Sequence, residues 1–159
     1  MKRQLKKVVC LALITSMILG QKTLKTTKNV TAKEKKDIKI AIDAGHQARG
    51  NFATEPVGPG SSTRKAKVAG GATGVASHVP EYKLTLAVSK KLQKELKARG
   101  YKVYMIRTKN NVNISNKKRA QLANKSGADI YIRIHADSSN SRAVTGASGL
   151  YPSKANRYV

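Results

Sequence analysis

The chain has 159 residues and a mass of 17.2 kDa, a length that suits one ordinary domain but not two independent ones. Its 40% hydrophobic and 25% charged residues are close to globular averages, which excludes a wholly disordered chain and a multi-span membrane protein. Because 32 Lys and Arg oppose 8 Asp and Glu, the net charge of +24 predicts attraction to polyanions such as nucleic acid, anionic lipid or anionic cell-wall polymer.

The first twenty residues have the pattern of an export signal. Basic residues within positions 2–7 precede an apolar run at 8–19, which has the length of a signal-peptide core and is short for a membrane span. Gly20 is the best residue for the position before a cleavage site, but a clean small-x-small motif is missing. Residues 1–20 are therefore either a signal peptide or a retained N-terminal anchor. Since the only cysteine, Cys10, lies in this segment, the exported part would have neither a thiol nor a disulfide.

A lysine-rich stretch at residues 21–37 has no apolar periodicity, which is typical of a solvated basic linker. We therefore expect the folded domain to cover residues 38–159. Its first element is a short strand, in which isoleucines alternate with other residues over 38–43, and this strand ends in Ala44, Gly45 and His46. Residues 47–79 are rich in Gly and Pro and predict a long loop, which in a compact domain is usually functional.

The next element is a predicted helix of about five turns, opened by Pro80 and closed by Gly100. Apolar residues at helical spacing predict its buried stripe, which consists of Leu84, Ala87, Val88, Leu92 and Leu96. Extending this stripe back by three residues reaches Glu81, so one carboxylate is expected on the apolar face.

Two more strands and one more helix follow. The pattern predicts a strand over 103–106, a helix capped by Ser115 that runs to about residue 126 with Leu122 and Ala123 inward, and a strand over 130–134. Strands that alternate with helices through short connections favour an α/β fold with a mostly parallel sheet and helices on both faces.

His46 and His135 both come directly after predicted strands. The carboxyl ends of parallel strands lie at one edge of the sheet, where ligands bind, and the loop before Glu81 is long enough to bring this carboxylate there. Two histidines and a carboxylate are a common ligand set for catalytic zinc. His78 is a rival ligand in irregular sequence. Each residue also has an ordinary interpretation, because strand-end histidines often lie at the surface and a first-turn glutamate interacts with the helix dipole.

Four ordered blocks of the chain form a recognisable pattern: IAIDAGH at 40–46, the stretch from PEYKLTLAV to YMIRT at 80–108, KKRAQLAN at 117–124 and GADIYIRIHAD at 127–137. Together these blocks resemble the zinc-dependent N-acetylmuramoyl-L-alanine amidases of the type 3 family. Members of this family are bacterial cell-wall hydrolases that cut the amide between N-acetylmuramic acid and L-alanine. The resemblance implies Zn²⁺ held by His46, Glu81 and His135, with peptidoglycan as substrate.

The chain departs from the family pattern in two places. Asp137 stands where the family commonly has Asn, which adds a negative charge near the metal. The family also places a second glutamate, the general base and acid, on a strand near the end of the domain, whereas this chain ends at Val159 before that segment. We therefore expect the last part of the domain to be missing. Glu55 is a weak substitute for this glutamate, and its ordinary interpretation is a solvated loop charge.

Two functional hypotheses follow. The first is zinc-dependent hydrolysis of the N-acetylmuramic acid to L-alanine bond in cell-wall turnover or lysis, by a secreted or cell-wall associated protein. The alternative is a truncated remnant that binds zinc or cell wall without cleaving, because loss of a general acid or base costs about 10²- to 10⁴-fold in rate. Anionic wall polymers are further expected partners, and the membrane is a partner only through an uncleaved N-terminal segment. Nucleic acid is disfavoured, since aromatic residues make up 4% of the chain and include no Trp.

Overall fold

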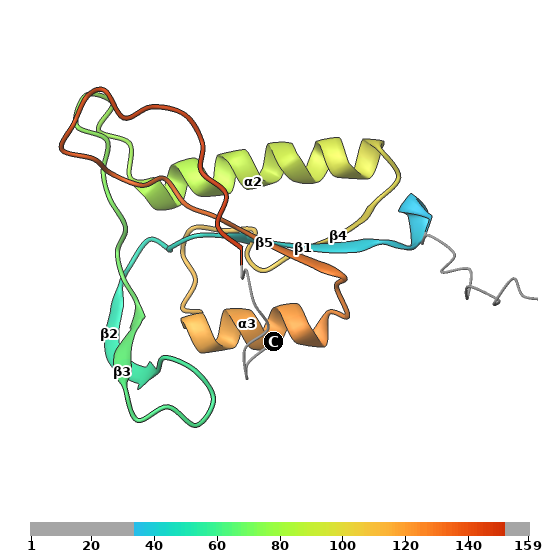
Figure 1. Cartoon of the computed structure of the whole chain (residues 1–159), viewed down its shortest axis with the longest axis horizontal. Helices are drawn as coiled ribbons and strands as arrows, with labels where there is room; N and C mark the ends of the chain where they lie inside the picture. Colours follow the sequence, from blue (N-terminus) through green and yellow to red (C-terminus); the bar gives the residue numbers. More distant parts are fainter. Residues whose placement is uncertain (1–33, 152–159) are drawn as a thin grey trace, which may run out of the picture. The chain divides into compact units, whose positions relative to one another are not determined.

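The computed structural model describes residues 34–151 (Figure 1). The expected signal or anchor at 1–20, Cys10 and the linker up to residue 33 lie outside the described residues. The last linker residues form a short 3₁₀ helix, η1 (Lys35–Asp37), next to the first strand. Within the described range, none of the helices combines the length and apolar character needed to span a membrane.

The core of the fold is a three-stranded parallel sheet, as the sequence predicts. It consists of β1 (Lys39–Ala44), β4 (Lys102–Met105) and β5 (Ile130–Ile134) in the order β4-β1-β5. In register, Ile40 pairs with Val103 of β4 on one side and with Ile130 of β5 on the other. Because β1 has a strand on each side and a helix on each face, its residues after Lys39 are all buried.

Two helices cover the opposite faces of this sheet (Figure 1). They are α2 (Glu81–Ala98) and α3 (Asn116–Lys125). The predicted cap of α3 is confirmed, because the Lys118 N–H donates to Ser115 Oγ over 3.2 Å. On this side the core is small: Ala41 packs with Ile106 and the inward Ala123.

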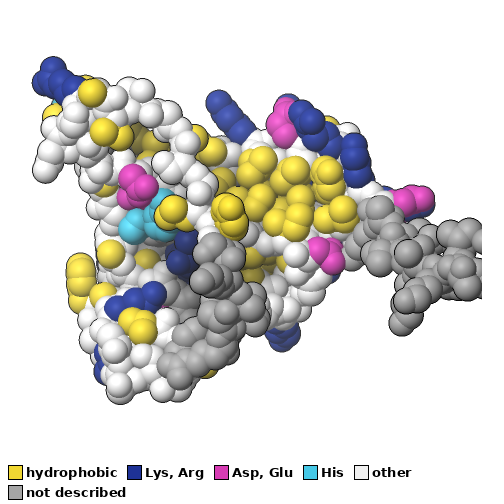
Figure 2. All heavy atoms as spheres, viewed as in Figure 1, with side chains coloured by type: hydrophobic (Ala, Val, Ile, Leu, Met, Phe, Trp, Pro, Cys, Tyr) yellow, Lys and Arg dark blue, Asp and Glu magenta, His cyan; other side chains and the backbone are white. Residues whose placement is uncertain are grey.

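The predicted buried stripe of α2 is wrong in its first half. Leu84 and Val88 are 45% and 41% exposed, and Ala87 is exposed as well. The buried side chains of the helix are instead Glu81, Thr85, Leu86 and Ser89. The sheet therefore meets a face with small polar residues, where Thr85 Oγ1 donates to the Gly45 carbonyl over 2.8 Å. Leu92 and Leu96 are half-buried, and Figure 2 shows hydrophobic side chains gathered at the surface in the region of α2.

The predicted loop at 47–79 is also wrong in part, because it contains a β-hairpin. Strands β2 (Asn51–Pro56) and β3 (Arg64–Val68) pair antiparallel, with a register irregularity between Asn51 and Thr54. The glycines and prolines that favour a loop lie mostly outside the two strands, and Gly60 in the turn has φ +70°. Irregular backbone follows from residue 69 to the start of α2.

Candidate metal centre

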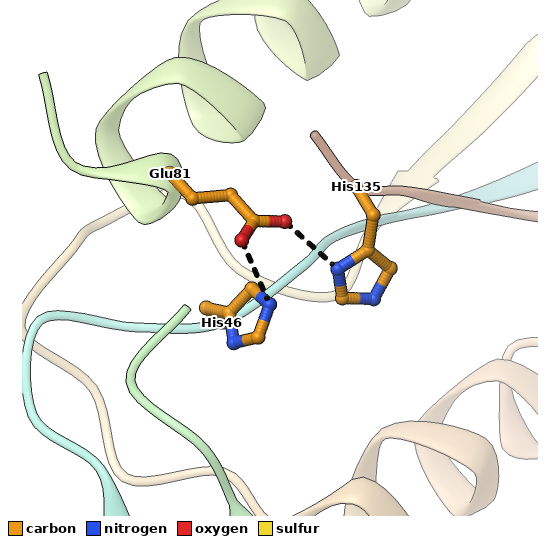
Figure 3. A group of neighbouring side chains, drawn as sticks. All are labelled: His46, Glu81 and His135. Carbon is orange, nitrogen blue, oxygen red and sulfur yellow. Dashed lines mark hydrogen bonds and ion pairs between the residues drawn. The ribbon is translucent and has the colours of Figure 1, made fainter. Parts of the chain in front are cut away.

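Three elements end or begin at the same edge of the sheet, and each contributes one predicted site residue (Figure 3). His46 follows β1, His135 follows β5 and Glu81 is the first residue of α2. His46 has φ +59°, a left-handed backbone conformation that costs energy in a non-glycine residue. The expected meeting of these three side chains is confirmed.

The Glu81 carboxylate bridges the two imidazole rings, with one oxygen toward each. Its Oε2 is 3.2 Å from His46 Nε2, and its Oε1 is 3.0 Å from His135 Nδ1 (Figure 3). One nitrogen or oxygen atom from each residue lies within 4.8 Å of the others, so a single cation could contact all three. The Glu81 side chain is 6% exposed, His46 15% and His135 38%, so the cluster opens to solvent on the side of His135.

The surroundings of Glu81 keep its carboxylate ionised. Burial raises the pKa of Glu81, but two backbone N–H groups, from Ala136 and Ala72, donate to its oxygens over 2.8 and 2.9 Å and lower it. The hydrogen bond with His135 lowers it further, as does the positive charge of His46 when that ring is protonated, so the net pKa of Glu81 is below its ordinary value. A carboxylate held in its charged form and in one orientation is suited to bind a cation.

A backbone carbonyl fixes the His46 ring. Its Nδ1 lies 2.9 Å from the Ala69 carbonyl oxygen, so a neutral imidazole that donates there leaves the lone pair of Nε2 facing Glu81. Histidines that bind metals commonly have this arrangement, in which a second acceptor sets the tautomer. Two imidazoles and one carboxylate fit the preferences of Zn²⁺.

Two glycines allow the chain to pack closely around the cluster. A Cβ atom at Gly45 would lie 2.6 Å from the Ile134 carbonyl oxygen and 2.7 Å from the ring of His135. A Cβ atom at Gly71, where φ is +86°, would lie 2.9 Å from Cγ of His46. Such contacts are too short for a real side chain, so both positions require glycine.

Arg119 of α3 is buried and holds the end of β1 in place. Its guanidinium donates to Asp43 Oδ1 over 2.6 Å, to the Ala44 carbonyl over 3.0 Å and to the His46 carbonyl over 2.9 Å. Asp43 also accepts from Arg133 over 2.7 Å, which leaves this fully buried carboxylate well paired.

The sequence alone did not point to Arg119. The only signal was Asp43 itself, since an acid in a buried strand needs a cationic partner, but the sequence does not say which of 32 cations it is.

Arg107, which follows β4, also holds the end of β1 in place. It donates to the carbonyls of Ala44, Gly45 and Tyr82 over 2.8 to 2.9 Å, which links the end of β1 to the first turn of α2. Burial lowers the pKa of Arg107 to about 10, with a contribution from Arg119, so Arg107 remains charged at neutral pH. Sequence reasoning did not identify this residue either.

The other candidate residues of the sequence lie apart from the cluster. His78 is exposed in the irregular segment and is not among the clustered side chains. Asp137 is exposed, two residues after His135. Glu55 is buried, and its Oε1 accepts from the Lys117 N–H over 2.8 Å in the first turn of α3. Its interpretation as a solvated loop charge is therefore wrong, because it serves as a cap of α3.

Comparisons with known proteins agree on one family. The profile described as N-acetylmuramoyl-L-alanine amidase matches residues 40–158. A search of curated proteins finds no significant match.

Solved structures of the same description resemble the chain. The amidase Ami1 of Mycobacterium smegmatis is 22% identical with a TM-score of 0.61, a likeness that shows the fold, and the match covers 67% of this chain and 50% of that one. The amidase of Clostridium difficile 630 is 30% identical with a TM-score of 0.50, over 69% of this chain and 49% of that one. The catalytic domain of CwlV from Bacillus (Paenibacillus) polymyxa var. colistinus is 26% identical with a TM-score of 0.50, over 67% and 49%. The chain thus spans about half the length of these structures.

Proposed function

The chain belongs to the N-acetylmuramoyl-L-alanine amidase family, and we propose that it takes part in zinc-dependent hydrolysis of the amide between N-acetylmuramic acid and L-alanine in peptidoglycan. The observation that carries this proposal is the cluster of His46, Glu81 and His135 at the carboxyl edge of the sheet. Because peptidoglycan lies outside the cytoplasm, the protein would work in the cell wall, in turnover or lysis.

We assign the three clustered side chains as the zinc ligands. A bound Zn²⁺ supplies a Lewis acid that polarises an amide carbonyl and lowers the pKa of water. The residues of the chain fix the ligands: Ala72 and Ala136 orient the carboxylate of Glu81, and the Ala69 carbonyl orients the ring of His46. Exposure of His135 gives a substrate a way to reach the cluster.

Amide hydrolysis also needs a group that delivers a proton to the leaving amine. Glu55 does not suit this role, because its carboxylate is buried against the first turn of α3 and accepts from the Lys117 N–H. The alternative function therefore deserves a direct test: a protein that holds zinc and wall material without cleaving.

Metal content is the first measurement. Purified chain should bind one zinc ion, measured by mass spectrometry of the metal and by calorimetric titration. His46→Ala and His135→Ala should lose this binding, since each removes one of three ligands. His78→Ala is the matched control, because this exposed histidine lies outside the cluster, and it should bind zinc as the unchanged protein does. Equal zinc content in all four proteins would refute the ligand assignment.

Product analysis then separates the two functions. Purified peptidoglycan is incubated with the chain, with and without a chelator, and mass spectrometry is used to find newly freed L-alanine amino termini. Chelator-sensitive release supports the amidase reaction. Zinc binding without any release supports the alternative, in which the chain holds the metal and does not cleave.

A further inference from the structure

A hollow in the surface lies at the start of the segment that follows His46. It has a volume of about 490 Å³, within the range of small-ligand sites, and is open to solvent. Its lining comes from the loop after β1, the first residues of β2 and the loop before α3. Gln47, which lines it, is the residue directly after His46.

Amide side chains and one aromatic ring dominate this lining. The polar members are Gln47, Asn51, Asn111, Asn113 and a single cation, Arg49. In a chain of net charge +24, this hollow carries one charge and no carboxylate, so it is built for a neutral polar ligand more than for a polyanion. Gln47 is buried and bonded within the protein, so the exposed amides are those of Asn111 and Asn113. Amides can donate and accept at once, which suits ligands with hydroxyl and acetamido groups.

The aromatic ring belongs to Phe52, the only phenylalanine of the chain, whose residue is 76% exposed. An exposed phenylalanine contributes little to the stability of the fold, because most of its apolar surface stays in water. Its ring lies over Gly50, where an added Cβ atom would be 3.1 Å from Cζ of Phe52. The glycine therefore lets the ring lie close to the backbone and leaves most of its surface free for a ligand.

The amides of the hollow are partly pre-arranged. Asn51 Nδ2 donates to Asn113 Oδ1 over 3.0 Å, and Asn51 Oδ1 accepts from the Ala53 N–H over 3.2 Å. Gln47 Oε1 accepts from the Ile114 N–H over 3.0 Å, which ties the loop before α3 to the residue after His46. The side chain of Asn111 is exposed and bonds to no other residue within 34–151, so it is available to a ligand.

We propose that this hollow is a glycan subsite, in which the face of Phe52 stacks on an N-acetylated sugar while Asn111 and Arg49 hydrogen-bond to its polar groups. The inference rests on the proposed function, because peptidoglycan is a polymer of such sugars. Binding here would hold the glycan strand next to the residue that follows His46, and so bring the nearby peptide linkage toward the cluster.

The test uses the full chain and chitotetraose, a tetramer of N-acetylglucosamine that carries acetamido groups but lacks the lactyl group and the L-alanine amide that the proposed reaction cuts. Calorimetric titration should show binding by the unchanged protein, and Phe52→Ala should weaken it at least tenfold. Phe52→Trp should keep or strengthen it, because a larger ring offers a larger stacking face. Leu150→Ala is the matched control: it removes another exposed apolar side chain, 96% exposed, and should leave the affinity unchanged.

Zinc titration of the same proteins separates this inference from the proposed function. All four should bind zinc equally, since none of the changes touches the cluster. Lack of chitotetraose binding by the unchanged protein, or equal binding by Phe52→Ala, would overturn the subsite whatever the zinc result. An affinity loss on Phe52→Ala for an L-alanyl stem peptide instead of the sugar would also overturn it, because the hollow would then be a peptide site.

Discussion

A Cβ atom at Gly71 would lie 3.0 Å from Oε2 of Glu81, because the segment after β3 crosses directly over the carboxylate. The φ of +86° at Gly71 adds a second constraint, since side-chain-bearing residues rarely adopt it. We expect Gly71→Ala to displace this segment, whose Ala72 N–H donates to Glu81, and to weaken zinc binding at least tenfold. Calorimetric zinc titration measures the effect.

The neighbouring glycine provides the control for that prediction. A Cβ atom at Gly70 would meet no atom within 4 Å, and its φ is outside the left-handed range. Gly70→Ala should therefore bind zinc like the unchanged chain. If Gly71→Ala and Gly70→Ala bind zinc equally well, the close approach of the segment to Glu81 does not control the site.

Arg119, the buried arginine of α3, should contribute more to the free energy of unfolding than any surface cation. Arg119→Ala leaves Asp43 in the interior with Arg133 as its remaining cation. It also removes the guanidinium donor of the His46 carbonyl, whereas the Ala44 carbonyl still accepts from Arg107. Removing one partner of a buried ion pair costs about 3–5 kcal/mol, and we expect the lower end because Arg133 stays. Urea unfolding measures the loss. Arg99→Ala, at the exposed end of α2, is the control and should change stability by less than about 0.5 kcal/mol.

The sequence predicted the parts of the fold that depend on local pattern. Alternating isoleucines in β1, the Ser115 cap of α3 and the strand before His135 are each visible within a few residues, and the structure has all three. The meeting of His46, Glu81 and His135 also followed, because carboxyl ends of parallel strands lie at one edge.

Features that depend on contacts distant in sequence could not be predicted this way. The apolar spacing of α2 marks Leu84 and Val88, yet Thr85 and Ser89 are buried. The hydrogen bond from Thr85 Oγ1 to the Gly45 carbonyl, just after β1, fixes this face of the helix against the sheet. The cationic partners of Asp43, Arg119 and Arg133, are 76 and 90 residues away. Nothing in the local sequence around Arg119 separates it from the other cations on α3.

The unexpected orientation of α2 can be tested by comparing two leucines of the same helix. Leu86 is 6% exposed and Leu84 is 45% exposed. Leu86→Ala should lower the free energy of unfolding by about 2–4 kcal/mol, the usual cost of a cavity in a core. Leu84→Ala should cost less than about 1 kcal/mol. Urea unfolding measures both changes. If the two variants lose the same free energy of unfolding, the assignment of Leu86 to the buried face and Leu84 to the exposed face is wrong.

Glu55 separates a structural carboxylate from a catalytic one. Its Oε1 accepts from the Lys117 N–H over 2.8 Å at the beginning of α3, where a negative charge is favoured by the helix dipole. Glu55→Gln keeps an acceptor and removes only the charge, so unfolding should become easier by about 0.3–1 kcal/mol. Zinc affinity, and any release of L-alanine termini from peptidoglycan, should remain as in the unchanged chain. A loss of release with zinc affinity intact would instead assign Glu55 a part in proton transfer.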